Sequence, residues 1–167
     1  MLGRGPKPGS GGSVVVLLES KTERTFPAQS EKPVMDQIGL TFAPELLIVR
    51  TGQPAQFRND DDTLHNVHVN HEETREPAFN VAIPTAGAFD YTFMRDGFYR
   101  VGCDIHPAMA AAVFAASSPF VALAKPDGSF AFAGVPLGAW TVKVYASGRI
   151  LSKDVDVRAG QTDVTVE

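Results

Sequence analysis

The stretch YRVGCDIHPAMAAAVF, residues 99–114, contains the only cysteine of the chain, one of its four histidines and one of its four methionines. The three residues are spaced as Cys103-x-x-His106-x-x-Met109. A thiol, an imidazole and a thioether thus fall within one short segment that follows a run typical of a β-strand. Such a concentration of soft donor groups predicts a metal site in the loop after that strand.

The donor types restrict which metal this loop would hold. Thiolate and thioether ligands make a Mg²⁺ or Ca²⁺ site improbable, because both ions prefer oxygen. Two histidines and one cysteine with a weak axial methionine are typical of copper electron-transfer sites. The loop supplies only one histidine, so the hypothesis requires a second one from elsewhere in the chain.

The segment DDTLHNVHVN offers two upstream candidates, His65 and His68. It follows a polar run that reads as the end of one strand and the entry into the next. Alternation along a strand places His65 and Val67 on one face and His68 on the other. By this pattern alone either histidine fits the site.

The composition of the chain limits the classes of protein to which it can belong. The 167 residues are 44% apolar and 20% charged, which suits a soluble protein with one medium domain and a small appendage. The net charge of −4 predicts no nucleic-acid-binding face. A single cysteine excludes an internal disulfide. We expect no membrane span and no secretory signal in the given chain, because no apolar run is long enough for either.

Short apolar runs punctuated by Gly, Pro and Asp predict an all-β fold, either a sandwich or a barrel, without a long amphipathic helix. Asp127-Gly128 within the last fifty residues is a strong hairpin signal. We predict four parts: a flexible segment 1–12, an N-terminal strand and linker 13–33 that packs on the C-terminal module, a main domain 34–116, and a small β-module 117–167.

The sequence GFYRVGCDIHPAM resembles the C-terminal ligand loop of the cupredoxins, the blue copper proteins, and most closely that of the amicyanin and plastocyanin type. His65-Asn66-Val67-His68 is similar to the HNVH stretch of the same family, and GQPAQFRN at 52–59 to the strand before it. The resemblance covers residues 34–116. Residues 117–167 resemble, more weakly, a carboxypeptidase-regulatory-like β-module. The resemblance implies an all-β fold: a cupredoxin Greek-key β-sandwich plus a small appended β-sandwich-like module.

The resemblance also implies a function, namely single-electron transfer by one type 1 copper ion per chain that cycles between Cu(I) and Cu(II). Asn66 would pin the two ligand loops together, and the edge of the C-terminal histidine, with Pro107, Ala108 and Ala110 around it, would face a redox partner such as a c-type cytochrome or a dehydrogenase. The resemblance further implies work in the periplasm or otherwise outside the cytoplasm. We expect the protein not to be an enzyme, because copper oxidases and nitrite reductases need further histidine clusters and the chain has only four histidines. The implied copper ligands are His65, Cys103, His106 and Met109.

Two other functions compete with this interpretation. One is a periplasmic copper-binding protein or chaperone, which would favour an open surface rich in Met or His. The other is a structural β-sandwich protein without a metal. Of the residues outside the ligand set, we expect His68 on the opposite face from His65, His71 in a solvated loop, and Asp60–Asp62 in a solvated loop close to the site.

Overall fold

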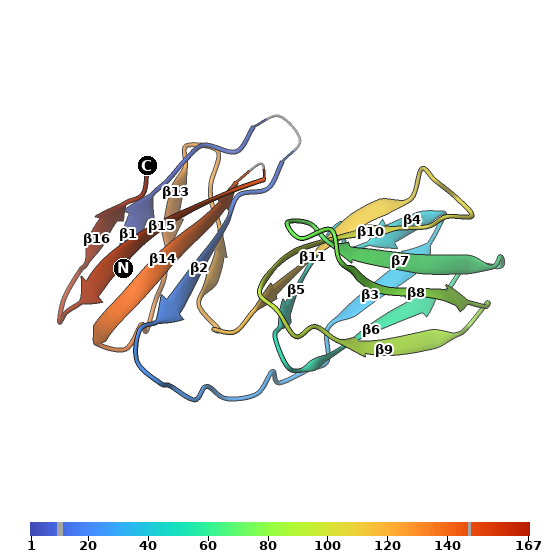
Figure 1. Ribbon diagram of the computed structural model, residues 1–167, viewed down its shortest axis with the longest axis horizontal. Helices are drawn as coiled ribbons and strands as arrows, with labels where there is room; N and C mark the ends of the chain where they lie inside the picture. Colours follow the sequence, from blue (N-terminus) through green and yellow to red (C-terminus); the bar gives the residue numbers. More distant parts are fainter. Residues whose placement is uncertain (10–11, 147) are drawn as a thin grey trace. The chain divides into compact units, whose positions relative to one another are not determined.

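The chain divides into two compact units in the computed structural model (Figure 1). One unit is Pro27–Ser117, and the other combines Met1–Phe26 with Ser118–Glu167. Every regular element in the described part of the chain is a strand, so the predicted all-β fold is confirmed. Nowhere in that part is there a helix capable of crossing a membrane. The described residues are 1–9, 12–146 and 148–167.

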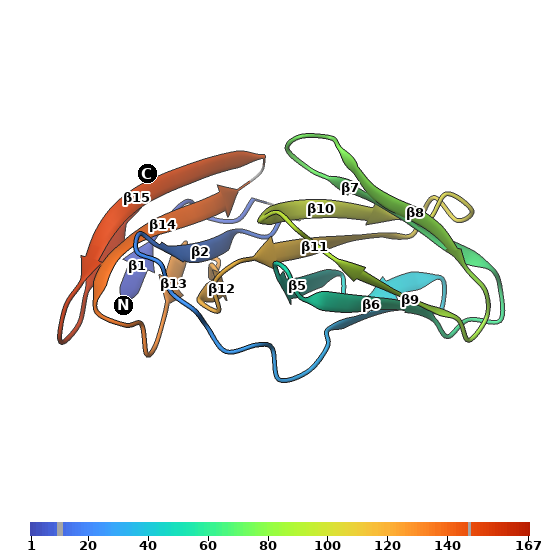
Figure 2. The same cartoon turned by 60° about the horizontal axis from the view of Figure 1, so that its bottom comes forward.

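The Pro27–Ser117 unit is a sandwich of two sheets (Figure 2). One sheet has the strand order β4 (Thr41–Ala43), β3 (Val34–Ile38), β6 (Pro54–Asn59), β9 (Ala88–Thr92). The other has the order β5 (Leu46–Arg50), β11 (Ala110–Ala116), β10 (Gly97–Gly102), β7 (His65–His71), β8 (Pro77–Ile83). Neighbouring strands are antiparallel except for the pairs β3–β6 and β5–β11.

The core of this unit follows from alternation along its strands. In β7, the apolar Val67 and Val69 are fully buried, and in β10 Val101 is 3% exposed. They meet side chains of the opposite sheet such as Met35 and Phe57, which are also fully buried. Burying one such side chain contributes about 1.5–3 kcal/mol. The shared core therefore fixes β7, which begins with His65, and β10, which leads directly into Cys103.

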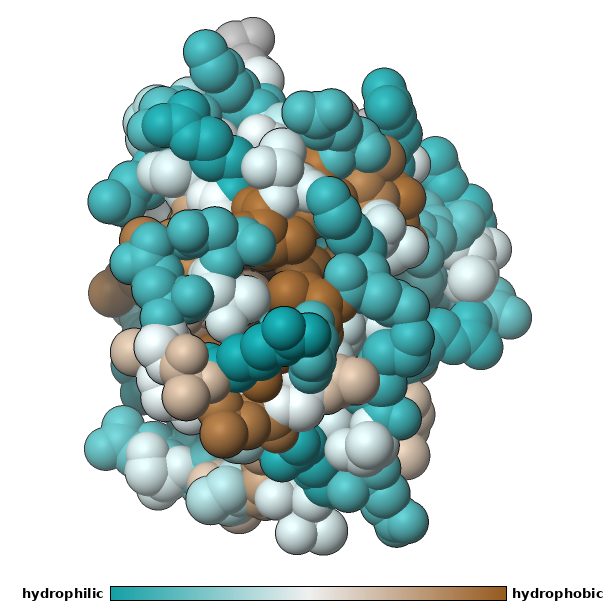
Figure 3. All heavy atoms as spheres, turned by 90° about the vertical axis from the view of Figure 1, so that its left-hand side faces the viewer, coloured by the Kyte–Doolittle hydropathy of each residue, from teal (hydrophilic) through white to brown (hydrophobic). Residues whose placement is uncertain are grey.

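The second unit also contains two sheets. One has the order β12 (Val121–Leu123), β2 (Val15–Ser20), β14 (Gly138–Ala146), β15 (Arg149–Val157). The other has the order β13 (Ser129–Ala131), β1 (Leu2–Arg4), β16 (Asp163–Thr165). Trp140 is fully buried between them, with Val16, Leu18 and Phe130 in the same cluster. On the face drawn in Figure 3, a band of apolar residues runs between hydrophilic ones.

Residues 2–4, which the sequence places in a flexible segment, form β1 between β13 and β16. The strand is held on both edges, and Gly3 lets the ring of Phe130 come so close that a β-carbon there would lie 2.2 Å from it. A short Leu-Gly-Arg strand has no apolar alternation that would reveal it in the sequence. Residues 10 and 11 of the same segment lie outside the described residues.

Candidate metal centre

Adjacent strands deliver the predicted ligands to one end of the sandwich. His65 is the first residue of β7, and Cys103 follows directly after β10. The two strands are antiparallel neighbours with His68 opposite Gly102. The beginning of β7 and the end of β10 must therefore lie side by side.

Three donor atoms converge at this end. The side chains of His65, Cys103 and His106 each place a ligand atom within 4.8 Å of the others. The Cys103 Sγ atom lies 3.8 Å from Nδ1 of His65 and 3.8 Å from Nδ1 of His106. The two Nδ1 atoms are 3.0 Å apart. His65 is fully buried, Cys103 is 3% exposed, and His106 is partly exposed.

These distances suit one small metal ion. An ion about 2.0 Å from each nitrogen and about 2.3 Å from the sulfur, with angles of about 120°, sets sulfur and nitrogen about 3.8 Å apart and the two nitrogens about 3.5 Å apart. Both observed sulfur–nitrogen distances match, and the nitrogen–nitrogen distance of 3.0 Å is only slightly shorter. The donor set and its spacing therefore fit a copper ion bound by two imidazoles and a thiolate.

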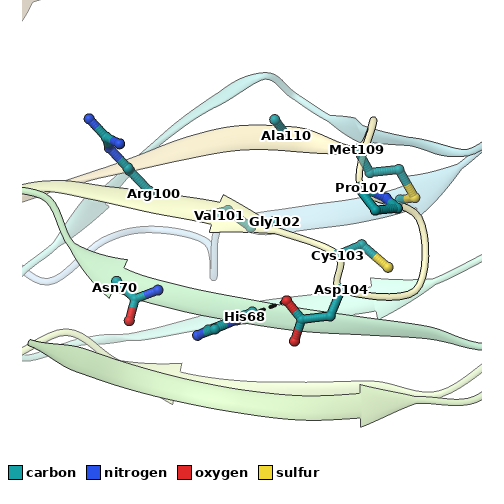
Figure 4. Close-up of a pocket in the computed structure, with 10 residues that line it drawn as sticks. All are labelled: His68, Asn70, Arg100, Val101, Gly102, Cys103, Asp104, Pro107, Met109 and Ala110. Carbon is teal, nitrogen blue, oxygen red and sulfur yellow. Dashed lines mark hydrogen bonds and ion pairs between the residues drawn. The ribbon is translucent and has the colours of Figure 1, made fainter. Parts of the chain in front are cut away.

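Met109 closes the loop that carries Cys103 and His106. Its amide donates to the carbonyl of His106 at 2.9 Å, and its carbonyl accepts the amide of Cys103 at 3.4 Å. Pro107 occupies the second position of the resulting four-residue turn, where its fixed φ is favourable. Met109 is 2% exposed. Figure 4 shows its sulfur atom and that of Cys103 directed to the same side of the loop.

Asp61 sets the tautomer of His65. The Nε2–H of His65 donates to Oδ2 of Asp61 at 2.9 Å, which leaves Nδ1 as the lone-pair nitrogen that faces Cys103. A carboxylate behind a ligating histidine is a common arrangement at metal sites. The pKa of Asp61 lies below its ordinary value, first because its carboxylate accepts the amide of Leu40, and further because of its bonds to His65 and Gly39.

Asn66 fastens the two ligand loops to each other, as predicted. Its Oδ1 accepts the amides of Asp104 at 2.7 Å and Ile105 at 3.3 Å, and it lies 3.3 Å from the Cys103 sulfur. Its Nδ2 donates to Asn80 at 2.8 Å and to Asp104 at 3.0 Å. The segment between Cys103 and His106 is therefore tied to the start of β7.

His68 lies on the opposite face of β7 from His65, as predicted. It is half-exposed, and its Nδ1 lies 3.0 Å from Oδ1 of Asp104. Together with a bond from Asn80, this contact keeps the pKa of Asp104 below its ordinary value. His68 and Asp104 help to line a surface groove of about 450 Å³ beside the loop (Figure 4). Its lining residues are His68, Asn70, Arg100, Val101, Gly102, Cys103, Asp104, Pro107, Met109 and Ala110.

The expectation for His71 is wrong, because the residue is 4% exposed and not solvated. β7 runs through His71, so alternation turns its side chain inward with Val67 and Val69. Its ring packs edge to face on Tyr99, with centroids 4.8 Å apart. Its Nδ1 lies 3.2 Å from the amide and the hydroxyl of Thr74. His71 thus closes a turn far along the strand from the metal centre.

Asp61 also departs from the solvated loop predicted for Asp60–Asp62, since its side chain is only 14% exposed. Sequence reasoning missed its bond to His65, and likewise the contacts that Asp104 makes with His68 and Asn80. The only available signal for Asp61 was its position four residues before His65.

Solved structures with a similar fold include copper proteins. A purple cupredoxin from Nitrosopumilus maritimus is 20% identical, and the match covers 50% of this chain and 99% of that one, with a TM-score of 0.45. An amicyanin from Paracoccus versutus is 17% identical over 59% of this chain and 96% of that one, with a TM-score of 0.46. A Cu-containing nitrite reductase from Thermus scotoductus is 20% identical over 58% of this chain and 25% of that one, with a TM-score of 0.47.

The Pro27–Ser117 unit has the two-sheet β-sandwich architecture that the resemblance to the cupredoxins implies. No protein-family model and no curated protein matches the chain. The resemblance of residues 117–167 to a carboxypeptidase-regulatory-like module stays a prediction. The case for a metal site therefore depends on the residues of this chain and their distances.

Proposed function

We propose that the chain is an electron-transfer protein that binds one copper ion in a type 1 site. The observation that carries the proposal is the convergence of two imidazole nitrogens and one thiol sulfur within 4.8 Å. Copper, when bound, supplies a one-electron couple between Cu(II) and Cu(I). The proposed ligands are His65, Cys103, His106 and Met109.

The surroundings of these residues suit a carrier of single electrons. Cys103 would bind as the thiolate, and His65 is oriented by Asp61 with Nδ1 free to coordinate. Asn66 ties the loop of Cys103 to β7 through two main-chain amides. Ligands held in this way need to move little when the charge of the centre changes. Such a role requires neither a substrate pocket nor an acid–base pair, so we propose a carrier and not an enzyme.

We propose that electrons enter and leave through His106, the partly exposed member of the set. Its neighbour Ile105 is 47% exposed, and Leu64, which precedes His65, is 48% exposed. Exposed aliphatic side chains are frequent where proteins dock. The proposed partner is a redox protein, such as a c-type cytochrome or a dehydrogenase, outside the cytoplasm.

Absorption and EPR spectra of the protein with one equivalent of Cu(II) test the proposed function. We expect an intense thiolate-to-copper band and a small copper hyperfine splitting. Cys103→Ser should abolish both, because it removes the sulfur ligand. His68→Gln is the matched control, since it removes a histidine from the other face of β7 and should leave both signals intact. Ordinary Cu(II) spectra that Cys103→Ser does not alter would refute the type 1 site and favour copper binding at the surface.

A further inference from the structure

The hairpin that joins β3 and β4 has a leucine in an unusual backbone conformation. Ile38 pairs with Thr41, so Gly39 and Leu40 form a two-residue connection. Both adopt left-handed backbone angles, with φ of 61° and 57°. A glycine is at ease there, but a leucine is not, because its β-carbon crowds the main chain.

Packing of side chains does not explain the conformation of Leu40. Its side chain is 53% exposed. A β-carbon built on Gly39 would meet nothing within 4 Å, so the neighbouring position is open as well. The turn must therefore be stabilised through its main chain.

Asp61 provides that stabilisation. Its Oδ1 accepts the amide of Gly39 at 2.5 Å, and its Oδ2 accepts the amide of Leu40 at 2.9 Å. The same Oδ2 accepts Nε2–H of His65 at 2.9 Å. One carboxylate thus binds two amides of a surface turn and the imidazole of a proposed copper ligand.

The loop that carries Asp61 is itself firmly held. The Asp61 amide donates to Oδ1 of Asn59 at 3.0 Å. Asn59 is fully buried, and its Nδ2 donates to the carbonyls of Thr63 at 2.8 Å and Ile83 at 2.9 Å. A carboxylate fixed in this way can hold His65 and the turn in one mutual arrangement.

We propose that Asp61 is a positioning residue that holds His65 with Nδ1 toward the metal and couples this ligand to the Gly39–Leu40 turn. The proposal rests on the function proposed above. Coupling of this kind is reciprocal, so metal binding at His65 must be felt at the turn, and a change in the turn must be felt at His65.

Metal affinity tests the positioning role. Zn(II) serves as a redox-silent probe of the holo site, and Asp61→Ala should weaken its binding about 10–100-fold, the usual cost of losing a partner behind a ligand. Asp61→Asn keeps one acceptor oxygen and should fall between Asp61→Ala and the unmodified protein. Asp62→Ala is the matched control for charge, since Asp62 is exposed and adjacent, and it should bind Zn(II) normally. Equal affinities for Asp61→Ala and Asp62→Ala would overturn the proposal.

Nuclear magnetic resonance tests the coupling. Zn(II) binding should shift the amide signals of Gly39 and Leu40 in the unmodified protein and leave them nearly unmoved in Asp61→Ala, which has no acceptor oxygen. Shifts of the same size in both would show that the metal reaches the turn by another route and would refute the coupling. If the variants do not fold, the imidazole ¹H–¹⁵N signals of unmodified His65 decide, because a proton on Nδ1 contradicts the proposed arrangement.

The two proposals fail separately. A protein without the thiolate-to-copper band refutes the copper function, while the Zn(II) affinities still decide on Asp61. If the protein shows that band, but substitution of Asp61 changes neither the Zn(II) affinity nor the amide shifts, the proposed copper function stands. The proposed positioning role of Asp61 is then refuted.

Discussion

Asn66 and Asp104 hold each other by two hydrogen bonds of opposite direction. The Asp104 amide donates to Oδ1 of Asn66 at 2.7 Å, and Nδ2 of Asn66 donates back to Oδ2 of Asp104 at 3.0 Å. Asn66 follows His65 on β7, and Asp104 follows Cys103. The pair therefore acts as a clasp between the two chain segments that bring the proposed metal ligands together.

Asn66→Ala should open this clasp. The amides of Asp104 and Ile105 would lose their acceptor, which costs about 1–3 kcal/mol when such groups stay shielded from water. Copper binding should weaken about 10–100-fold. Urea unfolding and metal titration measure the two effects. Asn80→Ala is the control, since it removes exposed hydrogen-bond partners of the Asn66 amide group and of Asp104 but leaves Oδ1 of Asn66 in place, and it should change stability by less than about 0.5 kcal/mol.

Met109→Leu tests the proposed axial ligand. Leucine has nearly the same volume, so the buried site should lose less than about 1.5 kcal/mol of stability. Removing a thioether donor withdraws electron density that favours Cu(II), so the reduction potential should rise while the blue colour persists. Voltammetry of the loaded protein measures the change. Met94→Leu alters a methionine that is 75% exposed and should leave the potential unchanged; an equal potential in both variants would mean that Met109 is no ligand.

Asp90 should contribute to the dependence of stability on pH. Its pKa lies below its ordinary value because it accepts hydrogen bonds from Lys32 and Gln56. The unfolded chain then binds the proton more readily, so the contribution is complete above the unfolded pKa of about 3.9 and is lost as the pH falls through the folded pKa. Asp90→Asn should flatten the decline in stability below about pH 4. Urea unfolding of the apoprotein at successive pH values checks this, and Lys32→Gln should give an intermediate slope.

The division of the chain into two units predicts that one fragment folds alone and another does not. Residues 27–117 should fold alone and show the full copper spectrum. Residues 118–167 should stay unfolded, because β2 lies between β12 and β14 and supplies the fully buried Val16 and Leu18 to the core around Trp140. At about 1.5–3 kcal/mol each, these two side chains alone are a large part of the total stability of a small domain, about 5–15 kcal/mol. Amide spectra measure folding: a peptide of residues 1–26 should restore dispersed signals, and dispersion without it would contradict the prediction.

The sequence reveals those parts of the site that depend on local spacing. Cys103, His106 and Met109 share one loop, so their spacing alone brings them together. His65 belongs to another strand, and alternation left His65 and His68 as equal candidates until the family resemblance decided between them. Which face of the sheet each histidine occupies depends on how β7 pairs with β10, a contact between segments far apart in the sequence.

The sequence could not reveal contacts that depend on the course of loops. Asp61 reaches both His65 and the turn at Gly39 only because buried Asn59 fixes the path of its loop. The residues around His71 are polar and predict a loop, but β7 continues to His71 and buries it against Tyr99. Polar residues are exposed on average, but an individual polar residue can be buried where it has hydrogen-bond partners.

The insertion of one unit within the other has a consequence for biosynthesis. β2 is made before Pro27–Ser117, whereas its partners β12 and β14 are made after it. At about 5–20 residues per second, the fifty residues that follow Ser117 take about 3–10 s to emerge from the ribosome. The Pro27–Ser117 sandwich can fold in this interval, while the apolar strand β2 still lacks its partner strands. Protection of this nascent strand, and not the stability of the finished molecule, would then limit the yield of the protein in the cell.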